Sequence, residues 1–156
     1  MSDKRQVDYG AHSTNRLSIP SLNDYLYVIG NLNAIGLIVG ETLWKVFGKR
    51  VQFLELIGDS IGAHLSDYIN RAIAQASGNK HHFKSRKSVV LDTAGPDFFT
   101  PNGTNFNPLN TNDAKRVYVI HTDTIAADAL ISIGAVDFYP NGGFNLVVHR
   151  LTMPMF

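Results

Sequence analysis

The amino-acid sequence predicts an α/β fold built on a largely parallel sheet. Short runs of β-forming residues alternate with helical apolar spacing, and the connections between the runs are long enough for crossovers. Polar residues with reactive side chains, Ser60, Asp92 and His121, fall at or just after the ends of the predicted strands. Parallel sheets collect reactive side chains at the carboxyl ends of their strands, so these residues are expected at one edge. The 156 residues, 44% of them hydrophobic, suffice for one domain core.

The first predicted helix follows a polar lead-in over residues 1–20, with Ser21 or Asn23 able to act as its N-cap. Three glycines inside it each weaken the helix by about 1 kcal/mol relative to alanine, and helices keep such glycines where another backbone comes close. Gly48 is expected to end the helix. Its apolar stripe recurs every three or four residues at Tyr25, Val28, Leu32, Ile35, Val39, Leu43 and Val46.

The remaining elements follow in order along the chain. Residues 51–57 are predicted to form a buried strand, residues 61–76 a helix that ends at Gly78, and residues 88–91, 117–120 and 136–139 three further strands. Residues 79–87 are a basic loop and residues 97–114 a long polar loop. No repeat or second domain is visible, which predicts a single domain over residues 1–156.

Composition excludes several classes of function. The formal net charge is +1, so nucleic-acid binding is not expected, and the basic loop is predicted to be a solvated surface. No window of 18 uncharged apolar residues exists, so no transmembrane helix is predicted. The absence of cysteine excludes disulfides, thiolate metal sites and cysteine catalysis, and no metal or cofactor is expected.

Gly58-x-Ser60-x-Gly62 lies between a predicted strand and a predicted helix, as in a nucleophile elbow. In such an elbow a sharp turn raises the serine hydroxyl above the sheet, and glycines let the strand and helix approach. The N–H of the next residue, Ile61, can then hold an oxyanion at the helix N-terminus. The alternative is an ordinary tight turn between strand and helix.

A nucleophilic serine needs a base, and the base needs an orienting acid. Asp92 follows the serine in the chain order of α/β hydrolases, although an aspartate there can also be a cap. Only His121 and His149 have the right order for the base, whereas His64 is expected to pack locally. Lone histidines are usually structural, so both alternatives stay open at this point.

Six segments, in order, resemble motifs of the animal lipase family typified by pancreatic lipase, which includes insect lipases and phospholipases A1. Leu56–His64 is similar to the family's Leu-Ile-Gly-His-Ser-Leu-Gly-Ala-His motif, and Leu91–Pro96 to its Leu-Asp-Pro-Ala-Gly-Pro motif. The others are residues 7–9, 25–36, 113–123 and 136–143. The resemblance implies an α/β-hydrolase core and a lipid or acyl ester as substrate. It assigns Ser60 as nucleophile, Asp92 as acid and the Ile61 N–H as oxyanion donor, and it removes His121 from the triad.

The sequence departs from the family pattern in ways that predict weak or lost activity. Asp59 stands where the family has histidine, and its negative charge disfavours a developing oxyanion. The family's early strands, second oxyanion donor, triad histidine region and C-terminal lipid-binding domain have no counterpart, which indicates a truncated member. His149 is the candidate surrogate base.

The alternative function is that of an inactive lipase homologue reused as a structural, self-assembling or lipid-binding protein. Without early strands, the sheet would expose an apolar edge, which predicts a homo-oligomer through that edge. The family's proteins are usually secreted, whereas the start here has no apolar signal region and the chain has no cysteine. These two features favour an intracellular location.

Overall fold

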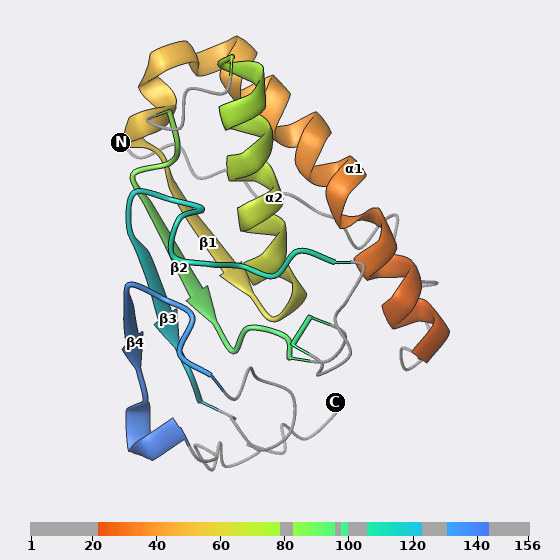
Figure 1. Ribbon diagram of the computed structural model, residues 1–156, viewed down its shortest axis with the longest axis vertical. Helices are drawn as coiled ribbons and strands as arrows, with labels where there is room; N and C mark the ends of the chain where they lie inside the picture. Colours follow the sequence, from red (N-terminus) through yellow and green to blue (C-terminus); the bar gives the residue numbers. More distant parts are fainter. Residues whose placement is uncertain (1–21, 79–82, 96–97, 100–105, 123–130, 144–156) are drawn as a thin grey trace, which may run out of the picture.

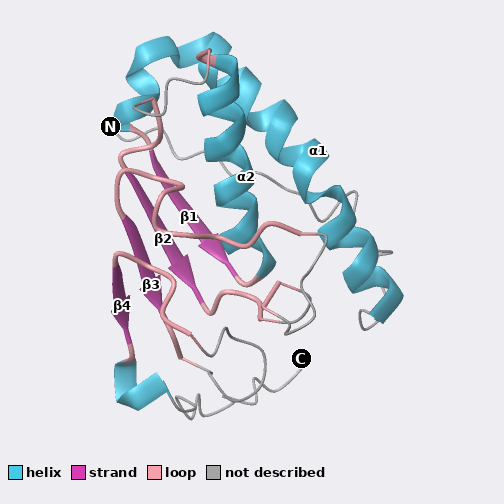
Figure 2. Cartoon of the chain, viewed as in Figure 1, coloured by secondary structure: helices cyan, strands magenta, loops and turns pink. Residues whose placement is uncertain are grey.

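The structure is a computed structural model, which describes residues 22–78, 83–95, 98–99, 106–122 and 131–143. The elements, in chain order, are helix α1 (Leu22–Phe47), 3₁₀ helix η2 (Gly48–Phe53), strand β1 (Glu55–Asp59), helix α2 (Ile61–Ala76), strands β2 (Lys87–Leu91), β3 (Val117–Ile120) and β4 (Val136–Phe138), and 3₁₀ helix η3 (Pro140–Gly143). Helices and strands form separate layers (Figures 1 and 2). The segment at residues 7–9 lies outside the described residues.

The four strands form one parallel sheet in the order β1-β2-β3-β4. Ile57 is paired with Val89, Val89 with Tyr118, and Tyr118 with Val136, so one row of side chains crosses all four strands. Every carboxyl end therefore lies at the same edge (Figure 1). The prediction of an α/β fold with a parallel sheet is confirmed.

The prediction of a buried strand over residues 51–57 is wrong in two respects. Val51 and Phe53 belong to the 3₁₀ helix η2, and β1 begins at Glu55, where pairing with Lys87 begins. Among the described strands, β1 also lies at the edge of the sheet, and Ile57 is 75% exposed. Strand propensity indicates that these residues suit a sheet, but the length of the neighbouring strand decides where pairing starts.

Helix α1 packs against α2, and α2 packs against β1 and β2 (Figure 1). Two of the three glycines of α1 make this packing possible. A Cβ on Gly36 would lie 2.4 Å from the Tyr68 Cβ, and one on Gly40 would lie 2.5 Å from the Ala72 Cβ. Gly30 has no heavy atom within 4 Å of such a position, so no close approach of a backbone requires glycine there.

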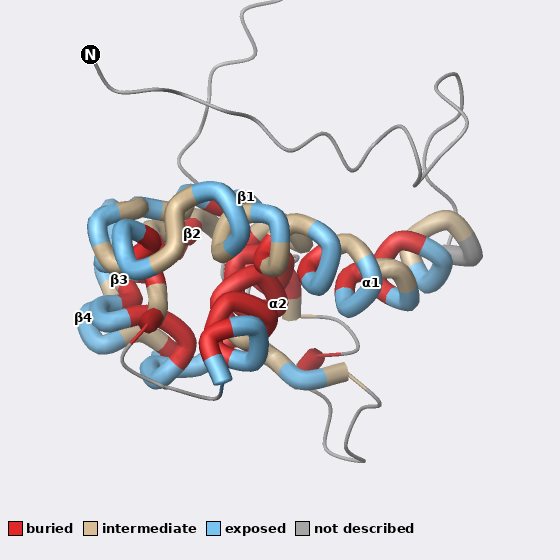
Figure 3. The backbone as a smooth tube through the Cα atoms, turned by 90° about the horizontal axis from the view of Figure 1, so that it is seen from above, coloured by how far each residue is buried: buried red, intermediate tan, exposed pale blue. Residues whose placement is uncertain are grey.

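The core lies between the helices and one face of the sheet. In Figure 3, α2 is buried along most of its length, whereas α1 alternates between buried and exposed residues. One cluster joins α1 to α2 through Ile29, Leu32, Ile69 and Ile73. A second cluster joins the sheet to the loop before β3 and contains Ala63, Val90, Leu109, Ala114, Val117, Val119 and Ile133.

No described helix packs on the opposite face of the sheet. Exposed or half-buried side chains alternate with buried ones along the strands, with Val89 and Tyr118 pointing away from the buried side. Ile57, Val136 and Phe138 on that face are 75%, 43% and 49% exposed. Parallel sheets are normally covered on both faces, so a face without a covering helix in the described part of the chain is unusual.

The stretch Asp24–Phe53 is long and apolar enough to cross a membrane by length and composition. One helix of this kind is weak evidence for a membrane span, and α1 buries Val28, Ile29 and Leu32 inside the fold. The hydropathy of this helix therefore does not indicate a transmembrane segment.

Candidate active site

Ser60 occupies a strained turn between the end of β1 and the start of α2. Its backbone torsions are φ 53° and ψ −119°, in a region that non-glycine residues rarely adopt. The Ser60 N–H donates to the Leu91 carbonyl at 2.9 Å, and the Ser60 carbonyl accepts from the Ala94 N–H at 3.3 Å. Such over-determined strain is typical of functional sites.

The flanking glycines allow this turn, as the sequence predicts. A Cβ on Gly58 would lie 2.3 Å from the Gly62 carbonyl oxygen and 2.8 Å from the Ala63 Cα. Both are backbone atoms, which cannot move aside as a flexible side chain could. The glycine at position 58 is therefore required by the close approach of β1 and α2.

Ile61 is the first residue of α2, directly after the elbow. The first N–H groups of a helix have no acceptor within the helix, and they lie at the positive end of its dipole. The position is suited to an oxyanion donor. Ile61 also packs its half-buried side chain against the core between α1 and α2, which anchors this end of the helix.

Asp92 directly follows β2 and has a positive φ of 42°. Its N–H donates to the Ile120 carbonyl at 2.9 Å, which ties it to the end of β3. Thr122 donates to both carboxylate oxygens, from its N–H to Oδ1 and from its hydroxyl to Oδ2, each at 2.5 Å. Thr122 thus fixes the orientation of the Asp92 carboxylate, which a triad acid requires.

His64 is fully buried on α2 and bridges two loops. Its Nε2 lies 2.8 Å from the Ala94 carbonyl, so it carries the proton and donates, and its Nδ1 accepts from the Leu109 N–H at 3.2 Å. The ring also stacks on Phe98 at 3.5 Å between centroids. Burial lowers the His64 pKa to about 4. His64 is a neutral structural residue, as expected, and it holds the loop after Asp92 against α2.

His121 is also fully buried, just after β3. Its Nε2 lies 2.8 Å from Oδ1 of Asp137, a half-buried residue of β4, and its ring stacks on Tyr139 at 4.4 Å between centroids. Asp137 also accepts from the backbone N–H groups of Ile133 and Gly134. The contacts join β3, β4 and the loop before β4, which agrees with the structural role that the resemblance implies.

The structure describes three of the four predicted site residues. Ser60, Ile61 and Asp92 lie at the carboxyl edge of the sheet, and the Ser60 backbone is hydrogen-bonded to residues on both sides of Asp92. His149, the candidate base, lies outside the described residues. The contact of Thr122 with Asp92 is not predicted from the sequence, because the two residues are 30 positions apart in the chain.

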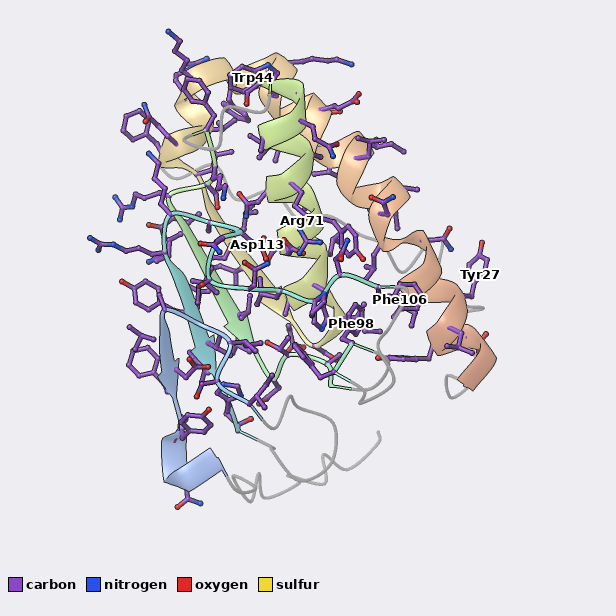
Figure 4. All side chains as sticks on the ribbon, in the orientation of Figure 1. Tyr27, Trp44, Arg71, Phe98, Phe106 and Asp113 are labelled. Atoms are coloured by element: carbon purple, nitrogen blue, oxygen red, sulfur yellow. The ribbon has the colours of Figure 1, made fainter. Side chains whose placement is uncertain are left out.

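A cluster of charged side chains from α2 and the loop before β3 is likewise not predicted from the sequence. The Arg71 Nη2 lies 2.5 Å from Oδ2 of Asp67, one helical turn away, and the Arg71 Nε lies 3.5 Å from Asp113 (Figure 4). Burial, with the neighbouring Asp113 carboxyl, raises the Asp67 pKa to about 10. Among the described residues no group of three potential ligands could hold a metal ion.

The described cations of the basic loop contact the protein itself. Lys84 donates to the Asn112 carbonyl, and Glu55 pairs with Arg86 at 2.9 Å and with Lys87 at 3.2 Å. They therefore tie β1 and β2 together and hold the loop before β3. The Arg86 side chain is still 63% exposed and that of Lys87 29% exposed, so these described cations remain partly solvated.

The comparisons with known proteins agree with the motifs. Residues 16–147 match the family described as Lipase. The chain is 32% identical over 143 residues to phospholipase A1 2 of Polistes dominula, which covers 88% of this chain and 42% of that protein. It is 29% identical over 138 residues to phospholipase A1 1 of Vespa affinis, with coverages of 86% and 39%.

A mammalian relative is also similar. Lipase member H of Rattus norvegicus is 32% identical over 127 residues, which cover 78% of this chain and 25% of that protein. The chain thus spans between a quarter and a little over two fifths of the length of these relatives. The family match over most of the chain, the parallel sheet and the glycine-flanked serine turn lead to one conclusion: the chain belongs to the lipase family of the pancreatic type.

Proposed function

We propose that this protein hydrolyses esters of lipids with Ser60 as its nucleophile. The observation that carries the proposal is the strained backbone of Ser60 at a turn between a parallel strand and a helix. An ordinary strand-to-helix turn needs neither a non-glycine residue at positive φ nor the backbone contact between Gly58 and Gly62. The names of the relatives, phospholipase A1 and lipase, support a lipid ester as the substrate class.

In the proposed reaction the Ser60 hydroxyl attacks the acyl carbonyl carbon, and His149 accepts its proton. Asp92, oriented by Thr122, stabilises the resulting imidazolium. The Ile61 N–H donates to the oxyanion, the alcohol leaves with the proton from His149, and water then hydrolyses the acyl-enzyme. Activity is expected to be weak, because the carboxylate of Asp59 is adjacent to the serine and disfavours negative charge there.

The test measures hydrolysis of a p-nitrophenyl acyl ester by the wild-type chain and by Ser60→Ala. We expect the variant to fall to the background rate, and Asp92→Asn to lose at least about a thousandfold. Ser132→Ala, which removes another serine hydroxyl, should keep the wild-type rate. Equal rates for wild type and Ser60→Ala would exclude Ser60 as nucleophile.

The base is tested separately with His149→Ala. We expect a loss comparable to that of Asp92→Asn, whereas His81→Ala should keep the wild-type rate. An unchanged rate in His149→Ala would remove His149 from the mechanism while leaving Ser60 as the proposed nucleophile.

The bare sheet face favours a second candidate function, that of an inactive homologue with a structural, self-assembling role. A row of apolar side chains crosses all four strands without a covering helix among the described residues. The two candidates differ in two measurements, since the second predicts no Ser60-dependent hydrolysis but a stable self-associated form.

A further inference from the structure

A chain of hydrogen bonds connects the buried His64 ring on α2 to the backbone of Ser60. The His64 Nε2 donates to the Ala94 carbonyl at 2.8 Å, and the Ala94 N–H donates to the Ser60 carbonyl at 3.3 Å. Ala94 lies two residues after Asp92 in the chain. One histidine side chain therefore contacts the short segment that joins the proposed acid to the backbone of the proposed nucleophile.

The opposite side of the His64 ring is fixed as well. Its Nδ1 accepts from the Leu109 N–H at 3.2 Å, and Leu109, which is 1% exposed, packs in the core cluster with Val90 and Val119 of the sheet. Phe98, labelled at the elbow end of α2 in Figure 4, stacks on the ring with the centroids 3.5 Å apart and the planes at 10°. With both nitrogens and one ring face in contact, the side chain is held in one orientation and one tautomer.

Only the neutral ring can make both of these hydrogen bonds. A protonated imidazole carries an N–H on each nitrogen, so Nδ1 could no longer accept from Leu109. Burial lowers the His64 pKa to about 4, and the nearby Arg71 guanidinium acts in the same direction. At neutral pH, Nε2 therefore donates to Ala94 while Nδ1 accepts from Leu109.

The Ser60 backbone is held from two sides by the segment that contains Asp92. Its N–H donates to the Leu91 carbonyl at 2.9 Å, and its carbonyl accepts from the Ala94 N–H. A serine at φ 53° is strained and keeps that conformation only while its surroundings enforce it. Loss of the His64 bond would free the Ala94 carbonyl, weaken the hold of Ala94 on Ser60 and let the distance between Ser60 and Asp92 vary.

We propose that His64 is a positioning residue for the proposed hydrolysis, because it holds Ser60 and Asp92 at their reactive separation through Ala94. The effect on rate rests on the proposed function, whereas the hydrogen-bonded geometry does not require catalysis. A purely structural His64 would contribute to the free energy of unfolding alone, so variants of equal stability would have equal rates. A positioning His64 gives rates that follow the hydrogen bond to Ala94, since a misplacement of about 1 Å costs about a hundredfold in rate.

Two substitutions separate the two hydrogen bonds of His64. Glutamine places an amide N–H at the reach of Nε2 and keeps the bond to Ala94, whereas asparagine places an amide oxygen at the reach of Nδ1 and keeps the bond from Leu109. Both variants lose the ring that stacks on Phe98, so we expect similar losses of stability. With a p-nitrophenyl acyl ester, His64→Asn should lower kcat at least about tenfold and change KM less than about twofold, whereas His64→Gln should keep kcat within about threefold of the wild type.

Ile73→Ala is the matched stability control, since Ile73 is fully buried on the same helix and packs in the cluster shared with α1. It should lower the free energy of unfolding in urea and keep the wild-type kcat, because it leaves the Ala94 contacts intact. Circular dichroism shows whether each variant is folded. Equal kcat values for folded His64→Asn and His64→Gln would overturn the proposal.

Hydrogen exchange of the Ala94 amide, followed by NMR at pH 7, tests the geometry without any substrate. In the wild type and His64→Gln this amide should exchange at least about a hundredfold more slowly than in an unstructured peptide, and in His64→Asn at least about tenfold faster than in the wild type. Exchange at the peptide rate in the wild type, or equal protection in the two variants, would contradict positioning by His64. Equal hydrolysis by the wild type and Ser60→Ala would reject the proposed function alone, and the exchange of the Ala94 amide would still decide the role of His64.

Discussion

The strained backbone of Ser60 positions the serine in the turn but lowers the stability of the fold. A residue with a Cβ at φ 53° costs of order 1–3 kcal/mol, whereas glycine adopts positive φ freely. The turn is nevertheless held by hydrogen bonds to Leu91 and Ala94. If hydrolysis depends on this serine, a strained residue at position 60 lowers the free energy of unfolding but is needed for activity.

Ser60→Gly is therefore expected to raise the free energy of unfolding by about 1 kcal/mol, because it relieves the strain. Ser60→Ala keeps a Cβ at the same torsions and should show little gain. Urea denaturation followed by circular dichroism measures both variants. A Ser60→Gly variant no more stable than Ser60→Ala would show that the turn is unstrained.

The buried Asp67 carboxyl makes the free energy of unfolding decrease as the pH rises. The Asp67 pKa is raised to about 10, so the folded chain holds a proton that the unfolded chain loses above its usual pKa near 4. The free energy of unfolding then falls as the pH rises above about 4. The groups that face Asp67 are Arg71, Asp113 and Lys84.

His64 has its pKa lowered to about 4, so between pH 4 and 6.5 the unfolded chain binds the extra proton. Its contribution rises with pH in that range and is complete above it. Below pH 6.5, Asp67 lowers the free energy of unfolding with rising pH while His64 raises it. Above pH 6.5, of these two groups only Asp67 still changes the free energy of unfolding with pH. We expect urea unfolding to show a decline in stability above pH 6.5.

Asp67→Asn should remove this decline, because the amide is neutral and of similar size. Glu41→Gln, an exposed carboxylate on α1, should leave the slope unchanged. An equal decline in the wild type and Asp67→Asn would contradict a protonated Asp67 in the folded protein.

At the scale of elements, the contact between α1 and α2 depends on small residues. A Cβ at Gly36 would lie 2.4 Å from the Tyr68 Cβ and 2.9 Å from its backbone carbonyl carbon, so the helices would have to separate. At Gly30 the same Cβ would point into open space. Gly30 therefore serves as the control position for a substitution at Gly36, because both glycines lie on α1.

Gly36→Ala is expected to lower the free energy of unfolding by about 1–3 kcal/mol, because the contact becomes overpacked. Gly30→Ala should raise it by up to about 1 kcal/mol through better helix propensity. Thermal or urea unfolding measures both. A stabilising effect of Gly36→Ala would indicate that α1 does not approach α2 this closely.

At the scale of the whole molecule, one face of the sheet exposes apolar side chains and has no covering helix among the described residues. Ile57, Val89, Tyr118 and Val136 form a continuous row, and Phe138 packs its ring on Tyr118 at 6.4 Å between centroids. β1 also has one unpaired edge among the described strands. An apolar face with an open edge favours pairing with another chain.

If the second candidate function holds, the 156-residue chain self-associates through this face, as measured by size-exclusion chromatography with light scattering. Ile57→Lys should dissociate the assembly, because it places a charge in the apolar row. Ile38→Lys, at a similarly exposed residue on α1, should leave the oligomeric state unchanged. A monodisperse wild-type monomer would contradict self-association.

The sequence by itself predicts α1 and α2 nearly to the residue, because apolar spacing and the glycines at 48 and 78 are local signals. It also indicates the elbow, since the two glycines around Ser60, between strand-forming residues and a helical apolar stripe, are adjacent in the chain. The start of β1 was predicted too early, because it depends on pairing with Lys87 and not on local propensity.

Only the tertiary structure decides what the other polar residues do. The clamp of Thr122 on Asp92, the bridge of His64 between Ala94 and Leu109, and the pairing of His121 with Asp137 all join residues from separate segments. The same holds for which face of the sheet the described helices cover. Local signals specify helices and turns because neighbouring residues create them, whereas burial and hydrogen-bond partners arise only when distant segments meet.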